Sequence, residues 1–166
     1  MKTLALLEAA RARSLKIATA ESCTGGLISA TLTEIPGSSD VFERGFVTYS
    51  NQAKTEMLGV SQELIDAKGA VSEEVARAMA EGAIHNSQAD LAVAVTGVAG
   101  PGGGSKDKPV GLVHIATARR DGPVSHERHV FSGDRREVRA ATLKRAIEFL
   151  LESVDSAGLP PFNFLD

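Results

Sequence analysis

The segment Asp90–Thr96 (DLAVAVT) constrains the fold more than any other part of the chain. Between its polar ends every residue is apolar, which is typical of a central strand covered on both faces. Such a strand needs helices on both sides of its sheet, so the segment predicts an α/β fold.

Helical and extended patterns alternate along the rest of the chain. We expect helices over residues 2–13, 24–34, 52–58, 61–68, 72–86 and 133–154, and strands over residues 16–20, 45–50, 90–96, 110–118 and 124–131. The last two strands are joined by residues 119–123 (RRDGP), whose Asp-Gly pair indicates a hairpin and requires one antiparallel strand. We therefore predict a three-layer α/β/α sandwich with a mixed, mostly parallel sheet of about five strands. One domain would occupy residues 1–155, followed by a C-terminal tail over residues 156–166.

Composition excludes several classes of function. The 166 residues carry a net charge of −3 without a run of Lys or Arg, and six Phe, one Tyr and no Trp offer few platforms for base stacking. The N-terminal segment is too polar for a signal peptide, and no stretch approaches the roughly 18 apolar residues of a membrane-spanning helix. A single Cys fits a reducing compartment. We therefore predict a soluble, cytoplasmic protein without nucleic-acid or membrane partners.

The segment Glu21–Gly26 (ESCTGG) breaks the chain where the first strand meets a helix. Backbone amides at a helix N-terminus suit a phosphate or an oxyanion, and Gly25 and Gly26 let a ligand approach closely. Ser22 is a candidate nucleophile there, although Ser is also a common helix cap. It lacks the G-x-S-x-G pattern, so a Ser-His-Asp hydrolase is not indicated. Cys23 is either a rival nucleophile or a buried hydrophobe, and Glu21 either orients a ligand or is solvated.

Lys54 and Tyr49 lie close together in the sequence, at the end of the second strand and the start of the next helix. In a dry pocket the pKa of Lys54 would fall, and its neutral amine could act as a base for a Ser hydroxyl. On the surface Lys54 would be an ordinary solvated charge. Tyr49 either enters a cleft or is an edge aromatic with its hydroxyl in water. Asn51 could donate to an anion or cap the helix that carries Lys54.

The segment Thr96–Ser105 (TGVAGPGGGS) is unusually dense in glycine for a connection after a central strand. Loops at the carboxyl ends of sheet strands commonly hold ligands, although a flexible surface loop is the alternative. Farther along, Arg135 and Arg136 lie at the start of the last helix and could bind phosphate or remain solvated. The four His show no metal-ligand spacing and one Cys provides no thiolate cluster, so we expect no metal.

Taken together, four ordered blocks resemble the CinA C-terminal-domain family of nicotinamide-nucleotide amidases. The blocks are ATAESCTGG, GFVTYSNQAK with TEMLGV, AVTGVAGPGGGS with KPVGLV, and FSGDR. The resemblance covers about residues 3–155, and none of the motif positions departs from it. Some family members also carry an N-terminal pyrophosphatase domain. No such domain is present in these 166 residues, so pyrophosphatase chemistry is not expected of them.

The resemblance implies that Ser22 is the nucleophile and that Lys54 and Tyr49 activate it. It also implies a metal-independent and cofactor-free enzyme that forms a homodimer, with the amides of ESCTGG and the glycine-rich loop around the substrate. Combined with the local patterns, the predicted substrate-binding residues are Glu21, Thr24, Gly25, Gly26, Asn51, Thr96, Gly97, Gly100, Gly102, Gly103 and Arg135.

The predicted reaction is hydrolysis of the carboxamide of nicotinamide mononucleotide, and Arg135 is the first candidate for the substrate phosphate, with Arg44 second. One alternative is a non-catalytic nucleotide-binding or partner-recruiting module of the competence- and damage-associated type. Another alternative is an amidase that depends on Cys23 in place of Ser22.

Overall fold

The structure, a computed structural model, describes residues 1–157. Its helices are α1 (Thr3–Ala12), α2 (Leu27–Thr33), η1 (Ser38–Asp40, a 3-10 helix), α3 (Asn51–Leu58), α4 (Gln62–Lys68), α5 (Glu73–His85) and α6 (Arg135–Ala157). Its strands are β1 (Ile17–Glu21), β2 (Phe42–Val47), β3 (Leu91–Gly97), β4 (Leu112–Arg119) and β5 (Val124–Val130).

The five strands form one mixed sheet in the order β2-β1-β3-β4-β5. Strand β1 is parallel to both β2 and β3, whereas β4 is antiparallel to both β3 and β5. Four strands therefore run in one direction and β4 runs in the other, because the chain reverses both in the loop before β4 and in the Asp-Gly hairpin after it. This arrangement confirms the predicted mixed sheet.

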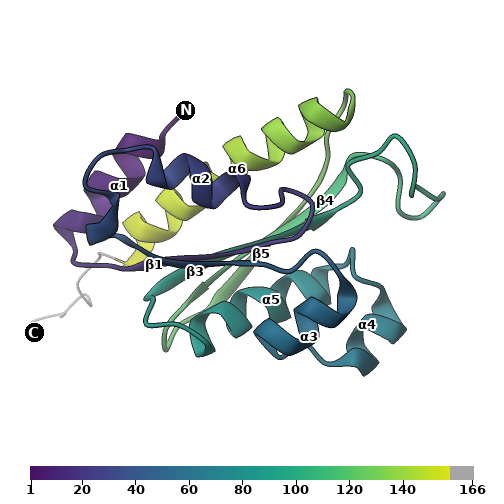
Figure 1. Ribbon diagram of the computed structural model, residues 1–166, viewed down its shortest axis with the longest axis horizontal. Helices are drawn as coiled ribbons and strands as arrows, with labels where there is room; N and C mark the ends of the chain where they lie inside the picture. The colour runs from purple at the N-terminus through teal and green to yellow at the C-terminus, as the bar shows by residue number, and fades with distance from the viewer. Residues whose placement is uncertain (158–166) are drawn as a thin grey trace, which may run out of the picture.

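Helices cover both faces of the sheet, with α1, α2 and α6 on one side and α3, α4 and α5 on the other (Figure 1). The central strand β3 supplies both layers of the core. Leu91, Val93 and Val95 pack with the first group of helices, whereas Ala92 and Ala94 pack with the second. The apolar run that predicted a central strand is thus buried on both faces, and the three-layer α/β/α fold is confirmed.

Several boundaries differ from the prediction. Strand β2 ends at Val47 instead of residue 50, because after the Thr48 N–H donates to the Glu21 carbonyl (2.9 Å) the chain leaves the sheet toward α3. Helix α2 begins at Leu27 instead of residue 24, because Gly25 and Gly26 have φ of 58° and 105° and hold a turn. Helix α6 continues to Ala157, past the start of the predicted tail, and the rest of that tail lies outside the described residues.

The parallel pairing brings distant parts of the chain to one end of the sheet. Glu21 at the end of β1 is in register with Val47 on β2 and with Val95 on β3. The segments that follow these three strands therefore meet at one edge. They are the ESCTGG turn, the segment leading to Lys54, and the glycine-rich loop.

Gly82 on α5 allows the close packing of α5 on the carboxyl end of α3, the helix that carries Lys54. A Cβ at this position would overlap the backbone carbonyl of Leu58. Gly82→Ala should therefore lower the free energy of unfolding by about 1–3 kcal/mol, because a backbone clash cannot be relieved by side-chain rotation. The higher helix propensity of Ala, about 1 kcal/mol, only partly offsets this. Urea unfolding measures the difference.

Gly102→Ala is the matched control, because a Cβ there meets nothing within 4 Å. It should change the free energy of unfolding by less than about 0.5 kcal/mol. Equal stability of the Gly82→Ala variant and the wild type would contradict the packing argument.

Candidate active site

Lys54 is buried at the end of the sheet and contacts Ser22. Its helix begins at a cap in which the Ser50 hydroxyl accepts from the Ala53 N–H (3.0 Å), so Ser50 and not Asn51 has the capping role. The Lys54 side chain then turns inward and the residue is 1% exposed. Its Nζ lies 2.9 Å from Ser22 Oγ, 2.9 Å from the Thr48 carbonyl oxygen and 3.3 Å from that of Tyr49. The predicted nucleophile and base are therefore in direct contact.

The surroundings of Lys54 favour its neutral form. Removal from water lowers the pKa of the amine from its ordinary value of 10.5. Within residues 1–157 no carboxylate forms an ion pair with this amine. The hydrogen-bond partners of the amine are therefore all uncharged, namely the Ser22 hydroxyl and the carbonyls of Thr48 and Tyr49.

Glu21 organises the turn that carries Ser22. Its fully buried carboxylate accepts hydrogen bonds from Thr24 Oγ1 (2.6 Å), Ile28 N (2.8 Å), Ser29 N (3.0 Å) and Ser29 Oγ (2.8 Å). Its oxygens are thus occupied by protein donors, and Glu21 does not line the cavity described below. The structure therefore places Glu21, predicted to bind substrate, outside the cavity with its carboxylate hydrogen-bonded to the turn and the start of α2.

The turn itself depends on its two glycines. Gly25 and Gly26 both have φ in the left-handed region, where a side chain would strain the backbone. The Gly25 N–H donates to the Ser22 carbonyl (3.1 Å), and the Ser22 N–H donates to the Val95 carbonyl on β3 (3.1 Å). These bonds hold Ser22 between the central strand and α2. The Gly25 amide, which was among the amides predicted to surround the substrate, is thus already hydrogen-bonded within the turn.

Cys23 is the neighbouring candidate nucleophile. It is 7% exposed, and burial raises the pKa of its thiol to about 11. Because the thiolate is the reactive form, Cys23 is not activated at neutral pH. The structure therefore favours Ser22 over Cys23.

A cavity of about 210 Å³ lies beside the Lys54–Ser22 pair. It is lined by Ser22, Cys23, Tyr49, Asn51, Lys54, Ala70, Val71, Thr96, Gly97, Ala99 and Arg135. All three predicted catalytic residues are among these, together with four of the predicted substrate-binding residues. Thr24, Gly25, Gly26, Gly100, Gly102 and Gly103 are not among the lining residues.

The glycine-rich loop contributes to the cavity mainly through its first residues. Thr96 Oγ1 donates to the Ala70 carbonyl (2.9 Å), which ties the end of β3 to the segment before α5. A Cβ at Gly97 would lie 2.7 Å from Val113 Cγ2, so packing against β4 already requires glycine there. Gly102 and Gly103 are exposed farther along the loop. The high glycine content therefore reflects packing and chain reversal as well as the cavity.

Tyr49 and Arg135 form the rim of the cavity. The Tyr49 side chain is 63% exposed, and its hydroxyl accepts from Arg135 Nη2 (3.2 Å). Arg135 Nη1 donates to the Gly100 carbonyl (2.9 Å). The contact between Tyr49 and Lys54 is made by the Tyr49 main-chain carbonyl, whereas the Tyr49 phenol is bonded to Arg135.

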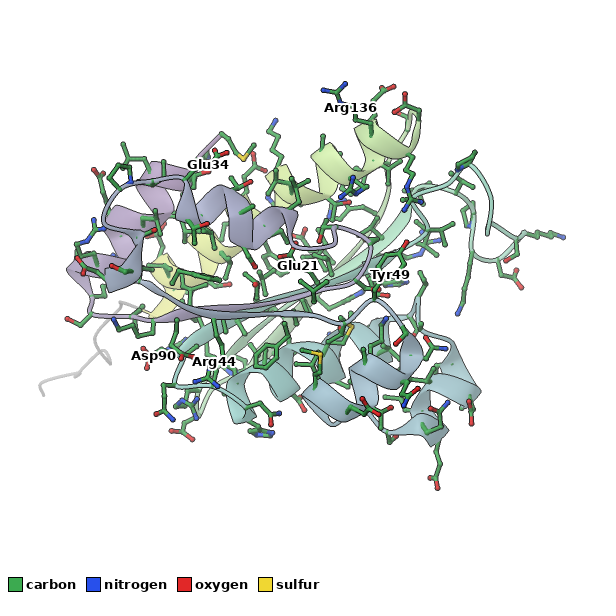
Figure 2. All side chains as sticks on the ribbon, in the orientation of Figure 1. Glu21, Glu34, Arg44, Tyr49, Asp90 and Arg136 are labelled. Carbon is green, nitrogen blue, oxygen red and sulfur yellow. The ribbon has the colours of Figure 1, made fainter. Side chains whose placement is uncertain are left out.

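A second cavity, of about 680 Å³, shares Ala99 and Arg135 with the first. Its other lining residues include Arg136 and Arg139, and Arg136 lies on the first turn of α6 (Figure 2). Arg44, the second candidate for phosphate, lines neither of these two cavities. It pairs with Glu43 (2.8 Å), donates to the Asn86 carbonyl (3.0 Å), and lies toward the opposite end of the sheet from Tyr49 (Figure 2).

Two residues near the site were not singled out from the sequence. Thr48 supplies a carbonyl to Lys54, a role that carries no side-chain signal. Arg139 donates to the carbonyls of Cys23 (3.2 Å) and Thr24 (3.1 Å). Its signal was present, because Arg139 is four residues after Arg135 and therefore on the same face of the helix.

Within residues 1–157, no group of three or more His, Cys, Asp and Glu side chains is placed to hold a metal ion. No helix in that range is both long and apolar enough to cross a membrane.

Comparison with known proteins gives a consistent family. Residues 2–154 match the family model of the CinA C-terminal domain. A protein of Enterobacter agglomerans named nicotinamide-nucleotide amidohydrolase PncC is 53% identical over 131 residues, covering 79% of this chain and 80% of that protein. The crystal structure of the competence/damage inducible protein CihA from Agrobacterium tumefaciens is 51% identical, with a TM-score of 0.89 over 92% of this chain and 93% of that one.

Several curated relatives are much longer. A putative competence-damage inducible protein of Caldicellulosiruptor bescii is 51% identical over 142 residues, which are 86% of this chain but 34% of that protein. The chain thus spans about a third of the length of such relatives. From the match over nearly all of its described residues, the chain belongs to the CinA C-terminal domain family.

Proposed function

We propose that this chain is a nicotinamide-nucleotide amidohydrolase, which converts nicotinamide mononucleotide and water to nicotinic acid mononucleotide and ammonia in pyridine-nucleotide recycling. The observation that carries the proposal is the 2.9 Å contact between the buried Lys54 Nζ and Ser22 Oγ beside a cavity. The name of the Enterobacter agglomerans relative supports this choice of substrate.

The contacts of Lys54 match the needs of a neutral amine. Such an amine has two N–H donors and one lone pair. The carbonyls of Thr48 and Tyr49 can accept the two N–H groups, which leaves the lone pair for the hydroxyl hydrogen of Ser22. Lys54 is then poised as a general base without a histidine or a metal-bound water.

The reaction proceeds through an acyl-enzyme. Ser22 Oγ attacks the carboxamide carbon while its proton passes to Lys54 Nζ, and backbone N–H donors stabilise the tetrahedral oxyanion by about 3–4 kcal/mol each. Lys54 then returns the proton to the leaving nitrogen, the C–N bond breaks, and ammonia departs. Water, deprotonated by Lys54, attacks the ester and regenerates Ser22.

The role of Tyr49 in this mechanism is to hold Lys54 and to shape the rim of the cavity. Its carbonyl helps to fix the amine, and its phenol is bonded to Arg135. We therefore propose no proton relay through the phenol, because that hydroxyl contacts neither Ser22 nor Lys54.

The two adjoining cavities fit the two ends of a nucleotide. The nicotinamide ring would occupy the smaller cavity beside Ser22, and the ribose phosphate would extend past Arg135 into the larger one. A guanidinium at that junction provides charge-assisted hydrogen bonds to a phosphate. Arg135 is therefore the phosphate ligand that we propose.

A non-catalytic nucleotide-binding or partner-recruiting module is the alternative reading, since many relatives have only competence-associated or CinA-like names. The buried amine favours catalysis. A binding module would have no use for a desolvated lysine whose lone pair can face a hydroxyl, and such a group lowers stability.

Purified protein should release ammonia from nicotinamide mononucleotide. Ser22→Ala and Lys54→Met should each lower kcat by at least about 1,000-fold, because each removes half of the nucleophile–base pair. Ammonia release, followed with a coupled glutamate dehydrogenase assay, measures the rates. Parallel assays with nicotinamide riboside and nicotinamide define how much of the nucleotide is needed.

Cys23→Ala is the matched control, because it removes the rival nucleophile next to Ser22 and should retain most of the turnover. Full activity in Ser22→Ala, or its loss in Cys23→Ala with a folded protein, would overturn the assignment of Ser22. A wild-type protein that binds the nucleotide without releasing ammonia would support the binding module.

Arg135→Gln should raise the KM for nicotinamide mononucleotide by about 10- to 100-fold, the loss expected for one charge-assisted hydrogen bond. It should weaken the binding of nicotinamide riboside much less, because the riboside has no phosphate. Arg44→Gln should leave both values unchanged, since Arg44 is directed away from the cavities. Equal losses for nucleotide and riboside in Arg135→Gln would show that Arg135 acts only on the shape of the site.

The buried Lys54 should also make stability depend on pH. The folded chain releases this proton more readily than the unfolded chain, which binds it up to about pH 10.5. Between the lowered pKa and that value the unfolded chain holds more protons, so stability rises with pH. Relative to Lys54→Met, the wild type should therefore gain free energy of unfolding between about pH 7 and about pH 9.5.

Urea unfolding at both pH values measures this gain. Lys144→Met is the control, because the Lys144 side chain is 67% exposed on α6 and should leave the slope with pH as in the wild type. Identical slopes for the wild type and Lys54→Met would contradict the lowered pKa of Lys54.

A further inference from the structure

The wall of the larger cavity carries positive charge that the protein does not neutralise. Arg135, Arg136 and Arg139 all line it, and within residues 1–157 none of the three forms an ion pair. By contrast, Arg145 on the same helix pairs with three glutamates. Asp134 also lines the cavity, but its carboxylate already accepts from a backbone N–H of α6 (2.9 Å). The wall therefore suits an anion from solution.

Arg139 has unused donors for such an anion. A guanidinium carries five N–H groups on two forked edges, one made by Nε and Nη2 and the other by Nη1 and Nη2. In Arg139 the first edge is occupied, because Nε donates to the Cys23 carbonyl (3.2 Å) and Nη2 donates to the Thr24 carbonyl (3.1 Å). Within residues 1–157 its Nη1 donates to no protein acceptor. The second edge is therefore available to a ligand in the larger cavity, which Arg139 lines.

Arg135 and Arg139 are placed to hold one phosphate together. They are four residues apart on α6, so they lie on the same face of the helix, and both line the larger cavity. Arg135 also lines the smaller cavity beside Ser22, so the pair reaches from one cavity to the other. A phosphate monoester carries roughly −1.5 to −2 charge near neutral pH, and forked guanidiniums bind its oxygens in pairs. Two arginines therefore match both its charge and its geometry.

Arg139 also connects this phosphate site to the nucleophile. The two carbonyls that it holds belong to Cys23 and Thr24, which directly follow Ser22. An arginine side chain loses rotamer entropy when it stays in one geometry. A phosphate bound at the second edge favours the same geometry, and so it favours the conformation in which the turn is held. Occupation of the larger cavity and the position of Ser22 are thus linked through one side chain.

We propose that Arg139 joins Arg135 as a ligand of the substrate phosphate, and that the bound phosphate activates the enzyme by fixing the turn of Ser22 through Arg139. The inference rests on the proposed amidase function, because it gives the substrate phosphate a second task in that reaction. Binding energy from a part of the substrate that does not react is then used to position the reacting groups. A substrate that lacks this part loses kcat as well as affinity.

A free dianion should therefore activate the enzyme toward a substrate without a phosphate. The erythrofuranosyl analogue of nicotinamide riboside lacks the exocyclic hydroxymethyl group, which leaves room for phosphite beside it. Phosphite should raise kcat/KM for this analogue in the wild type by at least about 10-fold, within the range typical of coupling between two sites, and by less than about twofold in Arg139→Gln. Ammonia release, with ionic strength held constant by sodium chloride, measures both values.

Three variants separate binding from activation. Arg135→Gln should need more phosphite but keep most of the activation at saturation, because Arg135 does not hold the carbonyls of the turn. Arg139→Lys keeps the charge without the fork, so it should lose most of the activation even if Arg139→Gln fails to fold. Lys144→Gln is the matched control, since it removes an exposed cation of the same helix and should be activated like the wild type. Thermal unfolding shows whether each variant is folded.

The nucleotide itself gives a second readout. Arg139→Gln should raise the KM for nicotinamide mononucleotide by about 10-fold and also lower kcat by about 10-fold, because it removes a phosphate contact and the link to the turn. A variant that merely damages the site would lower the rates for the nucleotide and the truncated analogue by equal factors. Equal factors would therefore contradict the proposed link.

Failure of the inference can be told apart from failure of the proposed function. No activation of the wild type by phosphite, or equal activation of the wild type and Arg139→Gln, would overturn the inference while the amidase function stands. No ammonia from nicotinamide mononucleotide with the wild type would instead overturn the proposed function.

Inorganic phosphate tests the site even without turnover. It should raise the Tm of the wild type and slow amide hydrogen exchange in residues 22–26, and it should do neither in Arg139→Gln. An unchanged Tm of the wild type would contradict a phosphate site. Equal effects on the wild type and Arg139→Gln would contradict the role of Arg139.

Discussion

The contact between a buried amine and a buried hydroxyl determines the arrangement of this end of the molecule. Lys54 is almost completely removed from water, and its partners are one hydroxyl and two main-chain carbonyls. Such a group lowers stability unless its hydrogen-bonding capacity is fully used. The early end of β2 directs the Thr48 and Tyr49 carbonyls at the amine, and the Ser50 cap fixes the start of the helix that delivers it. Local structure and chemistry are therefore specified by the same few residues.

The sequence predicts the fold well because its strongest signal is a property of burial. The apolar run of β3 requires cover on both faces, and the Asp-Gly hairpin requires an antiparallel strand. The ends of β2 were harder to predict, because pairing with β1 sets them and not the residues of β2 alone. The start of α2 also shifted, since two glycines extend the turn. Family membership is confirmed by the comparison, whereas the catalytic assignment stays a prediction.

The candidate site was predictable where it depends on side-chain chemistry. It was not predictable where it depends on the direction in which backbone groups point. Ser22, Lys54 and Tyr49 all reach one cavity, as expected. Local pattern alone favoured a solvated position for Lys54, and only the tertiary structure shows that it is buried. Carbonyl acceptors such as that of Thr48 have no residue signature, and Gly102 is exposed despite its place in a glycine-rich motif. Direction of backbone groups is a property of the folded chain.

The buried carboxylate of Glu21 could have prevented Lys54 from acting as a neutral base, because Glu21 directly precedes Ser22. A carboxylate beside Lys54 would stabilise the ammonium form and raise the pKa of the amine. Donors from Thr24, Ile28 and Ser29 occupy both oxygens of Glu21 and hold it on the side of α2. The same bonds that shape the turn therefore keep negative charge away from the amine. A neutral base next to a buried carboxylate is possible here because α2 and its preceding turn satisfy that carboxylate completely.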